Sequence, residues 1–254
     1  MHQPRPHRIS SAGLDLAVEE TEGNPPSVLW LSGFRSDMTG GKAVTLAHWG
    51  ARVGRRVVRF DYRGHGASGG KFEDFAISDW LADTLLVYDR FCEPGTVVVG
   101  SSMGGWIGLL LAQQAFRDKK PLGGLVLIAP AADFTERLMW PSFTDAQRDE
   151  VMETGKVLLP SEYDEPTPIT RYLIEDGRKI LLYGDDTIET GCPVHILQGV
   201  EDTAVPFSHA LELVERLARD DVVLTLIKDG DHRLSRDEDL ERLISAVEGI
   251  GRER

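Results

Sequence analysis

Two adjacent serines, Ser101 and Ser102, stand between glycines in the stretch VVVGSSMGGWIGLLLA, residues 97–112. A β-branched apolar run precedes them and an apolar, helix-like run follows, which predicts a strand-to-helix turn. The pattern G-x-S-x-G at such a turn lifts a serine hydroxyl above the sheet, where it can attack a carbonyl carbon. Only Ser102 has glycine both two residues before and two residues after it, and glycine avoids side-chain clashes in so sharp a turn. We therefore predict Ser102 as a nucleophile, with a plain glycine-rich connection as the alternative.

A serine nucleophile needs a histidine that accepts its proton. Three histidines follow Ser102 in the chain: His195, His209 and His232. His195 lies within an expected strand, where it would pack between layers, and His209 lies in the first turn of an expected helix. His232 follows the last expected strand, and parallel sheets form their sites at the carboxyl ends of strands. We predict His232 as the base, with His209 as the second choice.

The histidine in turn needs a carboxylate that orients it, and in chain order this acid lies between the serine and the histidine. The segment VHILQGVEDTAVP ends the preceding strand and offers Glu201 and Asp202. We predict Asp202, which fits G-x-x-D-x-x-V-P, and expect Glu201 to face solvent. Asp229 and Asp231 are close to His232 in sequence, and we expect them to shape its loop by bonding backbone amides.

The oxyanion that forms when a carbonyl is attacked needs backbone N–H donors. We predict Met103, directly after the nucleophile, and Phe34, which follows Gly33 in the loop after the first parallel strand. A simple turn-closing role for Gly33 is the alternative. The stretches TGGKA and HGASGGKF do not complete a phosphate-binding loop, and no dinucleotide or metal-ligand motif is present. The sequence therefore predicts neither a cofactor nor a metal.

Short apolar, β-branched runs alternate with amphipathic segments along the whole chain. Near-continuous apolar strands are typical of parallel sheets with both faces covered by helices. We predict one α/β domain over residues 1–254 with a mostly parallel, doubly wound sheet. Ser78 is an expected helix cap, and Asn24-Pro25-Pro26 an expected turn. The expected strands are 14–19 (antiparallel), 28–31, 56–60, 96–99, 122–128, 194–197 and 222–227.

The connection between the fourth and fifth parallel strands, about 65 residues, is far longer than one crossover helix requires. We predict a small lid insertion over about residues 133–190. Thr144 with Gln147 forms a capping-box pattern that starts a helix, and Gly155 is expected to end it. The segment PSEYDEPTP reads as a loop. Four large apolar side chains would line an acyl or aryl pocket or pack the lid onto the core: Leu138, Met139, Trp140 and Phe143.

The composition limits the classes of binding partner and the cellular compartments that are expected for this protein. The 254 residues carry 41 acidic and 28 basic side chains, and the net charge of -13 repels nucleic acid. No apolar run is long enough to span a membrane. The N-terminal residues MHQPRPHRIS lack the apolar core of a secretory signal, and two cysteines fit a reducing compartment. We predict a cytoplasmic protein.

The segments GFRSDMTGGKA, RFDYRGHGASGG, GSSMGGW, GVEDTAVP and DHRLSR resemble the α/β-hydrolase superfamily. Within it, they are similar to the mitochondrial palmitoyl-protein thioesterase and acyl-glucuronide esterase type. The resemblance covers most of the chain, with residues 133–190 the least diagnostic part. It implies an α/β-hydrolase fold, with Ser102, Asp202 and His232 as a catalytic triad.

The same resemblance implies a serine esterase or thioesterase that takes a small-molecule acyl ester or thioester. An S-acyl-protein thioesterase that acts on an acylated protein is the nearer alternative. A lyase or perhydrolase reaction on the same fold, or a non-catalytic binding module, is the alternative from another class.

Overall fold

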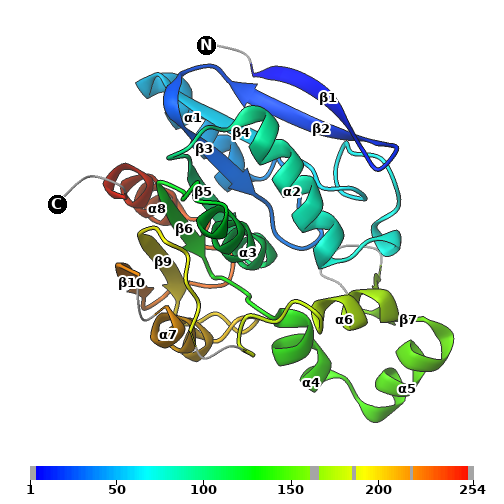
Figure 1. The fold of residues 1–254 in the computed structure, drawn as a ribbon. Helices are drawn as coiled ribbons and strands as arrows, with labels where there is room; N and C mark the ends of the chain where they lie inside the picture. Colours follow the sequence, from blue (N-terminus) through cyan, green and yellow to red (C-terminus); the bar gives the residue numbers. More distant parts are fainter. Residues whose placement is uncertain (1–3, 161–165, 185–186, 218–219, 251–254) are drawn as a thin grey trace.

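The computed structural model describes residues 4–160, 166–184, 187–217 and 220–250 (Figure 1). Across these ranges a central sheet of eight strands has the order β1-β2-β4-β3-β5-β6-β9-β10. The pairs β1–β2 and β2–β4 are antiparallel, and all other neighbours are parallel, so the predicted mostly parallel sheet is confirmed. The strands are β1 (Arg5–Ser11), β2 (Leu14–Thr21), β3 (Asn24–Leu31), β4 (Arg55–Phe60), β5 (Val97–Ser101), β6 (Gly124–Ile128), β9 (Val194–Gly199) and β10 (Val222–Ile227).

Helices cover both faces of the sheet, which explains why its inner strands are apolar on both sides. Val28 and Trp30 of β3 pack with residues of α1 (Gly41–Val53) and α8 (Asp237–Gly249). Leu29 and Leu31 face the other way, into the core formed with α2 (Ile77–Phe91), α3 (Met103–Arg117) and α7 (Phe207–Arg216). A short 3-10 helix, η1 (Phe72–Asp74), precedes α2. None of the helices in the described ranges is long and apolar enough to cross a membrane.

The long connection between β6 and β9 folds into elements of its own. They are η2 (Thr135–Met139, a π-helix), α4 (Trp140–Ser142), α5 (Asp145–Thr154), β7 (Lys156–Leu159), β8 (Thr167–Thr170) and α6 (Arg171–Gly177). Thr144 and Gln147 form the predicted capping box of α5, and Gly155 ends that helix in the left-handed conformation. Of the predicted loop PSEYDEPTP, residues 161–165 lie outside the described ranges, and Thr167 already belongs to β8.

One buried carboxylate joins the two ends of this insertion. Asp133 lies just after β6 and accepts hydrogen bonds from the backbone N–H groups of Leu182 (2.8 Å) and Tyr183 (2.7 Å). Burial raises the pKa of Asp133, while these N–H donors and nearby arginines act against that shift. The insertion therefore leaves and re-enters the domain at a single point. Its role as a lid stays a prediction.

Two local predictions were wrong. Strand β3 already starts at Asn24, whose N–H donates to the Gly54 carbonyl at 2.7 Å, so Asn24-Pro25-Pro26 is the irregular first part of a strand. Helix α2 starts at Ile77, before Ser78, and the Asp79 carboxylate accepts the N–H of Ala76 at 3.0 Å. Strand β1 was not predicted, because RPHRISS is polar and begins beside a proline.

Candidate active site

Ser102 occupies the turn between β5 and α3 with φ 53° and ψ -116°, a conformation that side chains rarely adopt. The glycines two residues before and after Ser102 are required because there is no room for a side chain at either position. A Cβ on Gly100 would lie 2.3 Å from the Gly104 carbonyl oxygen, and a Cβ on Gly104 would lie 2.2 Å from that of Leu31. The turn thus projects the Ser102 side chain from the carboxyl end of β5, as the glycine spacing predicts.

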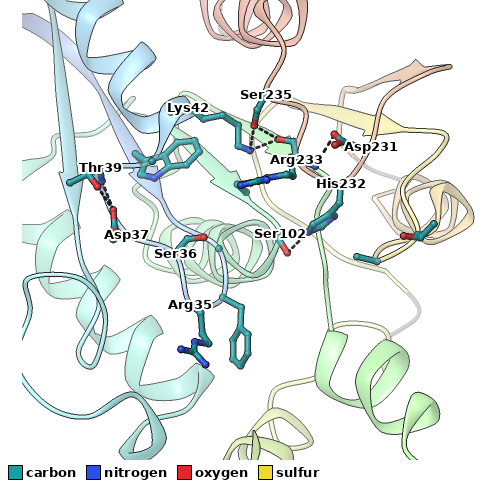
Figure 2. A pocket seen from close by; sticks show the side chains of 18 of the residues that line it. Arg35, Ser36, Asp37, Thr39, Lys42, Ser102, Asp231, His232, Arg233 and Ser235 are labelled. Carbon is teal, nitrogen blue, oxygen red and sulfur yellow. Dashed lines mark hydrogen bonds between the residues drawn. The ribbon is translucent and has the colours of Figure 1, made fainter. Parts of the chain in front are cut away.

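The structure brings Ser102, Asp202 and His232 together from three different loops. His232 follows β10, and its Nε2 lies 3.2 Å from Ser102 Oγ (Figure 2). Its Nδ1 lies 2.8 Å from the Oδ2 atom of Asp202, which follows β9. A proton on Nδ1 would be shared with Asp202, and Nε2 would then be free to accept the hydroxyl hydrogen of Ser102. This arrangement can abstract a proton from Ser102.

The Asp202 carboxylate is buried and surrounded by donors. Its Oδ1 accepts the N–H groups of Ala204 (2.9 Å) and Val205 (2.8 Å). Burial by itself favours the protonated form, but hydrogen bonds from His232 and these two amides outweigh it and lower the pKa of Asp202. The group is therefore a stable anion, and it can hold an imidazole that gains a positive charge.

Gln198, at the end of β9, is a fourth partner of Asp202 that the sequence analysis did not identify. Its fully buried side chain places Nε2 3.2 Å from Asp202 Oδ2, 3.0 Å from the Val205 carbonyl and 3.1 Å from the Gly199 carbonyl. All three neighbours are acceptors, which fixes the orientation of the amide. The signal in the sequence was a glutamine directly after the apolar residues Ile196 and Leu197 of this strand.

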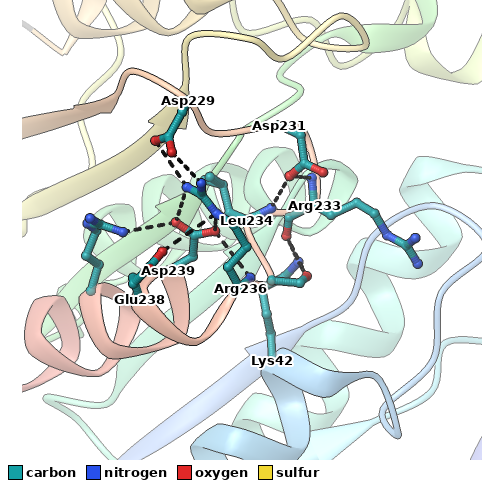
Figure 3. A network of polar contacts seen from close by, with 10 residues as sticks. Lys42, Asp229, Asp231, Arg233, Leu234, Arg236, Glu238 and Asp239 are labelled. Carbon is teal, nitrogen blue, oxygen red and sulfur yellow. Dashed lines mark hydrogen bonds and ion pairs between the residues drawn. The ribbon is translucent and has the colours of Figure 1, made fainter.

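The loop that carries His232 is held by its own charged residues (Figure 3). Asp231 Oδ1 accepts the N–H groups of Arg233 (3.0 Å) and Leu234 (2.9 Å), as expected. Asp229 differs from the prediction, because its Oδ2 binds the Arg236 guanidinium at 2.6 Å.

Arg236 also binds Asp239 of α8 at 2.8 Å. Hydrogen bonds from Arg236 lower the pKa of both Asp229 and Asp239. The network ties the His232 loop to the start of α8.

The other two histidines are bonded elsewhere. His195 on β9 places Nε2 2.9 Å from Thr225 Oγ1 on the neighbouring strand. His209 lies in the first turn of α7, as predicted, and its Nε2 lies 2.9 Å from the Ala132 carbonyl. Burial lowers the pKa of both histidines. His209, the second choice for a base, is therefore not joined to Ser102, and Glu201 is exposed.

The two expected oxyanion donors, Met103 and Phe34, belong to segments next to Ser102. Met103 is the first residue of α3, where a backbone N–H has no acceptor within the helix. Phe34 follows Gly33 in the loop after β3, and Gly33 is so close to the turn that a Cβ there would lie 3.3 Å from the Ser101 carbonyl oxygen. The roles of Met103 and Phe34 as oxyanion donors stay predictions.

A buried histidine supports the Phe34 loop. His65 Nε2 lies 3.3 Å from the N–H of Arg35, and its Nδ1 lies 3.2 Å from the Arg63 carbonyl. The ring packs edge-on against Phe72 and Trp80. Burial lowers the pKa of His65 to about 4, so the ring is neutral near pH 7 and can accept the Arg35 N–H.

A cavity of about 670 Å³ opens beside Ser102 (Figure 2). Its walls come from residues 33–42 after β3, from the loop after β9 and from residues 231–235. The apolar side chains considered for an acyl pocket do not line it. Phe143 is buried, and the others are partly buried and pack against the core: Leu138, Met139 and Trp140.

Comparisons with known proteins identify the family of this chain. The family model described as "Alpha/beta hydrolase family" matches residues 28–246. The mitochondrial palmitoyl-protein thioesterase ABHD10 of Mus musculus is 31% identical over 240 residues, which span 93% of this chain and 78% of the relative.

Two solved structures are also similar. A putative hydrolase from Agrobacterium vitis S4 has 46% identity and a TM-score of 0.92, covering 97% of this chain and 98% of its own. The alpha/beta hydrolase domain-containing protein 10 from mouse has 29% identity and a TM-score of 0.85, covering 96% and 97%. The family model covers the chain from within β3 to within α8, including every loop of the site, and the chain belongs to the α/β hydrolase family.

Proposed function

We propose that this protein is a serine hydrolase that cleaves carboxylic ester or thioester bonds of small acyl or aryl substrates through an acyl-enzyme on Ser102. The observation that supports it most is the continuous line of contacts from Ser102 Oγ to His232 (3.2 Å) and from His232 to Asp202 (2.8 Å). Membership of a hydrolase family supports the same class of reaction.

In the proposed mechanism, His232 Nε2 takes the proton of Ser102 as the serine oxygen attacks the acyl carbon. The N–H groups of Phe34 and Met103 bind the oxyanion of the tetrahedral intermediate. His232 then gives its proton to the leaving oxygen or sulfur, and the bond to the acyl group breaks. A water molecule, deprotonated by His232, releases the acid and restores Ser102. Asp202 holds the imidazole in the required tautomer and stabilises its positive charge.

Replacement of the nucleophile tests the proposal. Ser102→Ala should lower the rate of 4-nitrophenyl acetate hydrolysis by at least about 1,000-fold and abolish labelling by a fluorophosphonate. Ser101→Ala is the matched control, since it removes the neighbouring hydroxyl and leaves the glycine spacing intact. A Ser102→Ala protein that kept the rate of the unmodified protein would refute the proposal.

A thioester substrate, including an S-acylated protein, is favoured by the names of the curated relatives, which are palmitoyl-protein thioesterases. Matched oxygen esters and thioesters of the same acyl group would separate the two activities through their kcat/KM ratio. Analysis of the products would detect a lyase or perhydrolase reaction. Because those relatives are described as mitochondrial, a cytoplasmic location stays a prediction.

A further inference from the structure

Among the described residues, three cations line the cavity beside Ser102 without forming an ion pair, and two of them, Lys42 and Arg233, are in contact. Lys42 comes from the first turn of α1 and Arg233 from the loop after β10, and Figure 2 shows both side chains extending into the same hollow. Lys42 Nζ donates to two neutral acceptors, the Arg233 carbonyl and, at 3.5 Å, Ser235 Oγ. Within the described part of the chain, neither cation has a carboxylate oxygen within 4.0 Å. We call this pair the Lys42–Arg233 subsite.

The acidic side chains nearest to the subsite are already engaged. Asp231 Oδ1 accepts two backbone N–H groups of its own loop, and Asp239 binds Arg236. Both still attract the Lys42 proton, but burial and the neighbouring Arg233 charge outweigh them and lower the pKa of Lys42 to about 8. The two like charges repel each other, and Lys42 is also partly removed from water, so the pair costs free energy. An anion placed between them would remove that cost.

The other two acidic side chains in the described cavity wall, Asp37 and Glu201, form no ion pair with Lys42 or Arg233. Asp37 accepts both the N–H (2.7 Å) and the hydroxyl (2.5 Å) of Thr39, and Glu201 is exposed on the loop after β9. The start of α1 adds positive potential, because its N-cap is Gly40, which offers no side-chain acceptor, and its first turn has no acidic residue. Arg35 extends the other way and donates to Thr167 Oγ1 at 3.0 Å.

We propose that the Lys42–Arg233 subsite binds an anionic group of the substrate, a carboxylate or a phosphate, while the ester or thioester carbonyl lies at Ser102. This inference rests on the proposed function and names the part of the substrate that the cavity selects. A lysine ammonium and an arginine guanidinium together suit the oxygens of either anion, the first as a compact charge and the second as a two-pronged donor. The anionic group lies either on the acyl side or on the leaving-group side of the scissile bond.

Matched neutral and anionic substrates test the subsite. The acyl-side pair is 4-nitrophenyl hexanoate and 4-nitrophenyl hydrogen adipate, and the leaving-group pair is phenyl acetate and 3-carboxyphenyl acetate. For each pair the measured quantity is the anionic-to-neutral ratio of kcat/KM. Comparison of this ratio between protein variants cancels the intrinsic reactivity of the two esters.

Lys42→Met should lower the ratio by about 10-fold to 100-fold for one of the two pairs, as expected for the loss of a charged hydrogen bond. Arg233→Gln, on an exposed loop, should act in the same direction and is available if the Lys42 variant does not fold. Lys228→Met is the matched control, because it removes the same charge from an exposed position after β10. Its ratio should stay within about twofold of the unmodified protein.

The pair that responds identifies the side of the substrate that carries the anion. Unchanged ratios in both subsite variants, with neutral esters still hydrolysed, would overturn the subsite and leave the proposed function standing. If neutral esters are not hydrolysed at all, the proposed function fails instead.

Calorimetry provides a readout that does not need turnover. Benzoate and phenyl phosphate should bind to the Ser102→Ala protein and bind at least about 10-fold more weakly when Lys42→Met is added. Affinity should also fall between pH 7 and pH 9, since Lys42 loses its proton near pH 8. Equal affinity with and without Lys42 would overturn the proposal.

Discussion

Acidification from pH 7 to pH 5 should destabilise this protein through one buried side chain, His65. Its imidazole accepts the N–H of Arg35 and is enclosed by aromatic rings, so a second proton would bring an N–H against an N–H and place a charge away from water. The folded protein therefore resists this protonation. An unfolded chain has no such restriction.

The size of the effect follows from the two pKa values of His65, about 4 in the folded protein and 6.5 as the ordinary value. Because the folded value is the lower one, the unfolded chain binds the proton first, and stability falls as the pH drops from 6.5 toward 4. The full difference corresponds to about 3 kcal/mol. Between pH 7 and pH 5 the expected loss from His65 alone is about 2 kcal/mol of the free energy of unfolding.

Urea unfolding followed by tryptophan fluorescence at pH 7 and pH 5 measures this loss. The His65→Gln protein should be less stable at both pH values, but its loss between them should be about 2 kcal/mol smaller than that of the unmodified protein. His48→Gln, at an exposed position on α1, is the control and should follow the unmodified protein. A pH-dependent loss in His65→Gln equal to that of the unmodified protein would refute the reasoning.

Three substitutions test the geometry around Ser102. Asp202→Asn should lower kcat by about 10,000-fold with the circular dichroism spectrum unchanged, and normal turnover would contradict its role in orienting the imidazole. Gln198→Leu should lower kcat about 10-fold through loss of one donor to that carboxylate, whereas a rise in KM alone would indicate a different role. Gly104→Ala should cost about 3 kcal/mol in thermal unfolding, because its Cβ would lie 2.2 Å from a backbone oxygen. Gly108→Ala, whose Cβ meets only side chains at 3.6 Å or more, should be neutral or stabilising.

The sequence predicted those features that local pattern controls. The glycine spacing identifies Ser102 as the residue at the turn because backbone oxygens occupy the places where side chains at positions 100 and 104 would lie. Asp202 and His232 were predictable because the carboxyl ends of neighbouring parallel strands share one edge of the sheet. The doubly wound sheet followed from apolar strands alternating with amphipathic helices.

The features that the sequence did not predict depend on contacts between distant segments. Gln198 meets Asp202 only because the chain after β9 folds back to place the Val205 carbonyl beside the same amide. Lys42 and Arg233 are 191 positions apart, and no pattern in the sequence predicts that they are in contact. Contacts between distant segments determine which charges lie near a site, so these charges are known only once the tertiary structure is known.

The contacts of Asp133 fix both ends of the insertion and so make the sheet tolerant of changes in the length of the insertion. Since the chain leaves and returns at one carboxylate, residues 134–181 form a closed loop whose ends are fixed whatever its length. Loop-closure entropy grows slowly, by about 0.6 kcal/mol for each doubling of length. Insertions and deletions within this segment should therefore change its length at little cost to the sheet, with Ser102 and His232 keeping their positions.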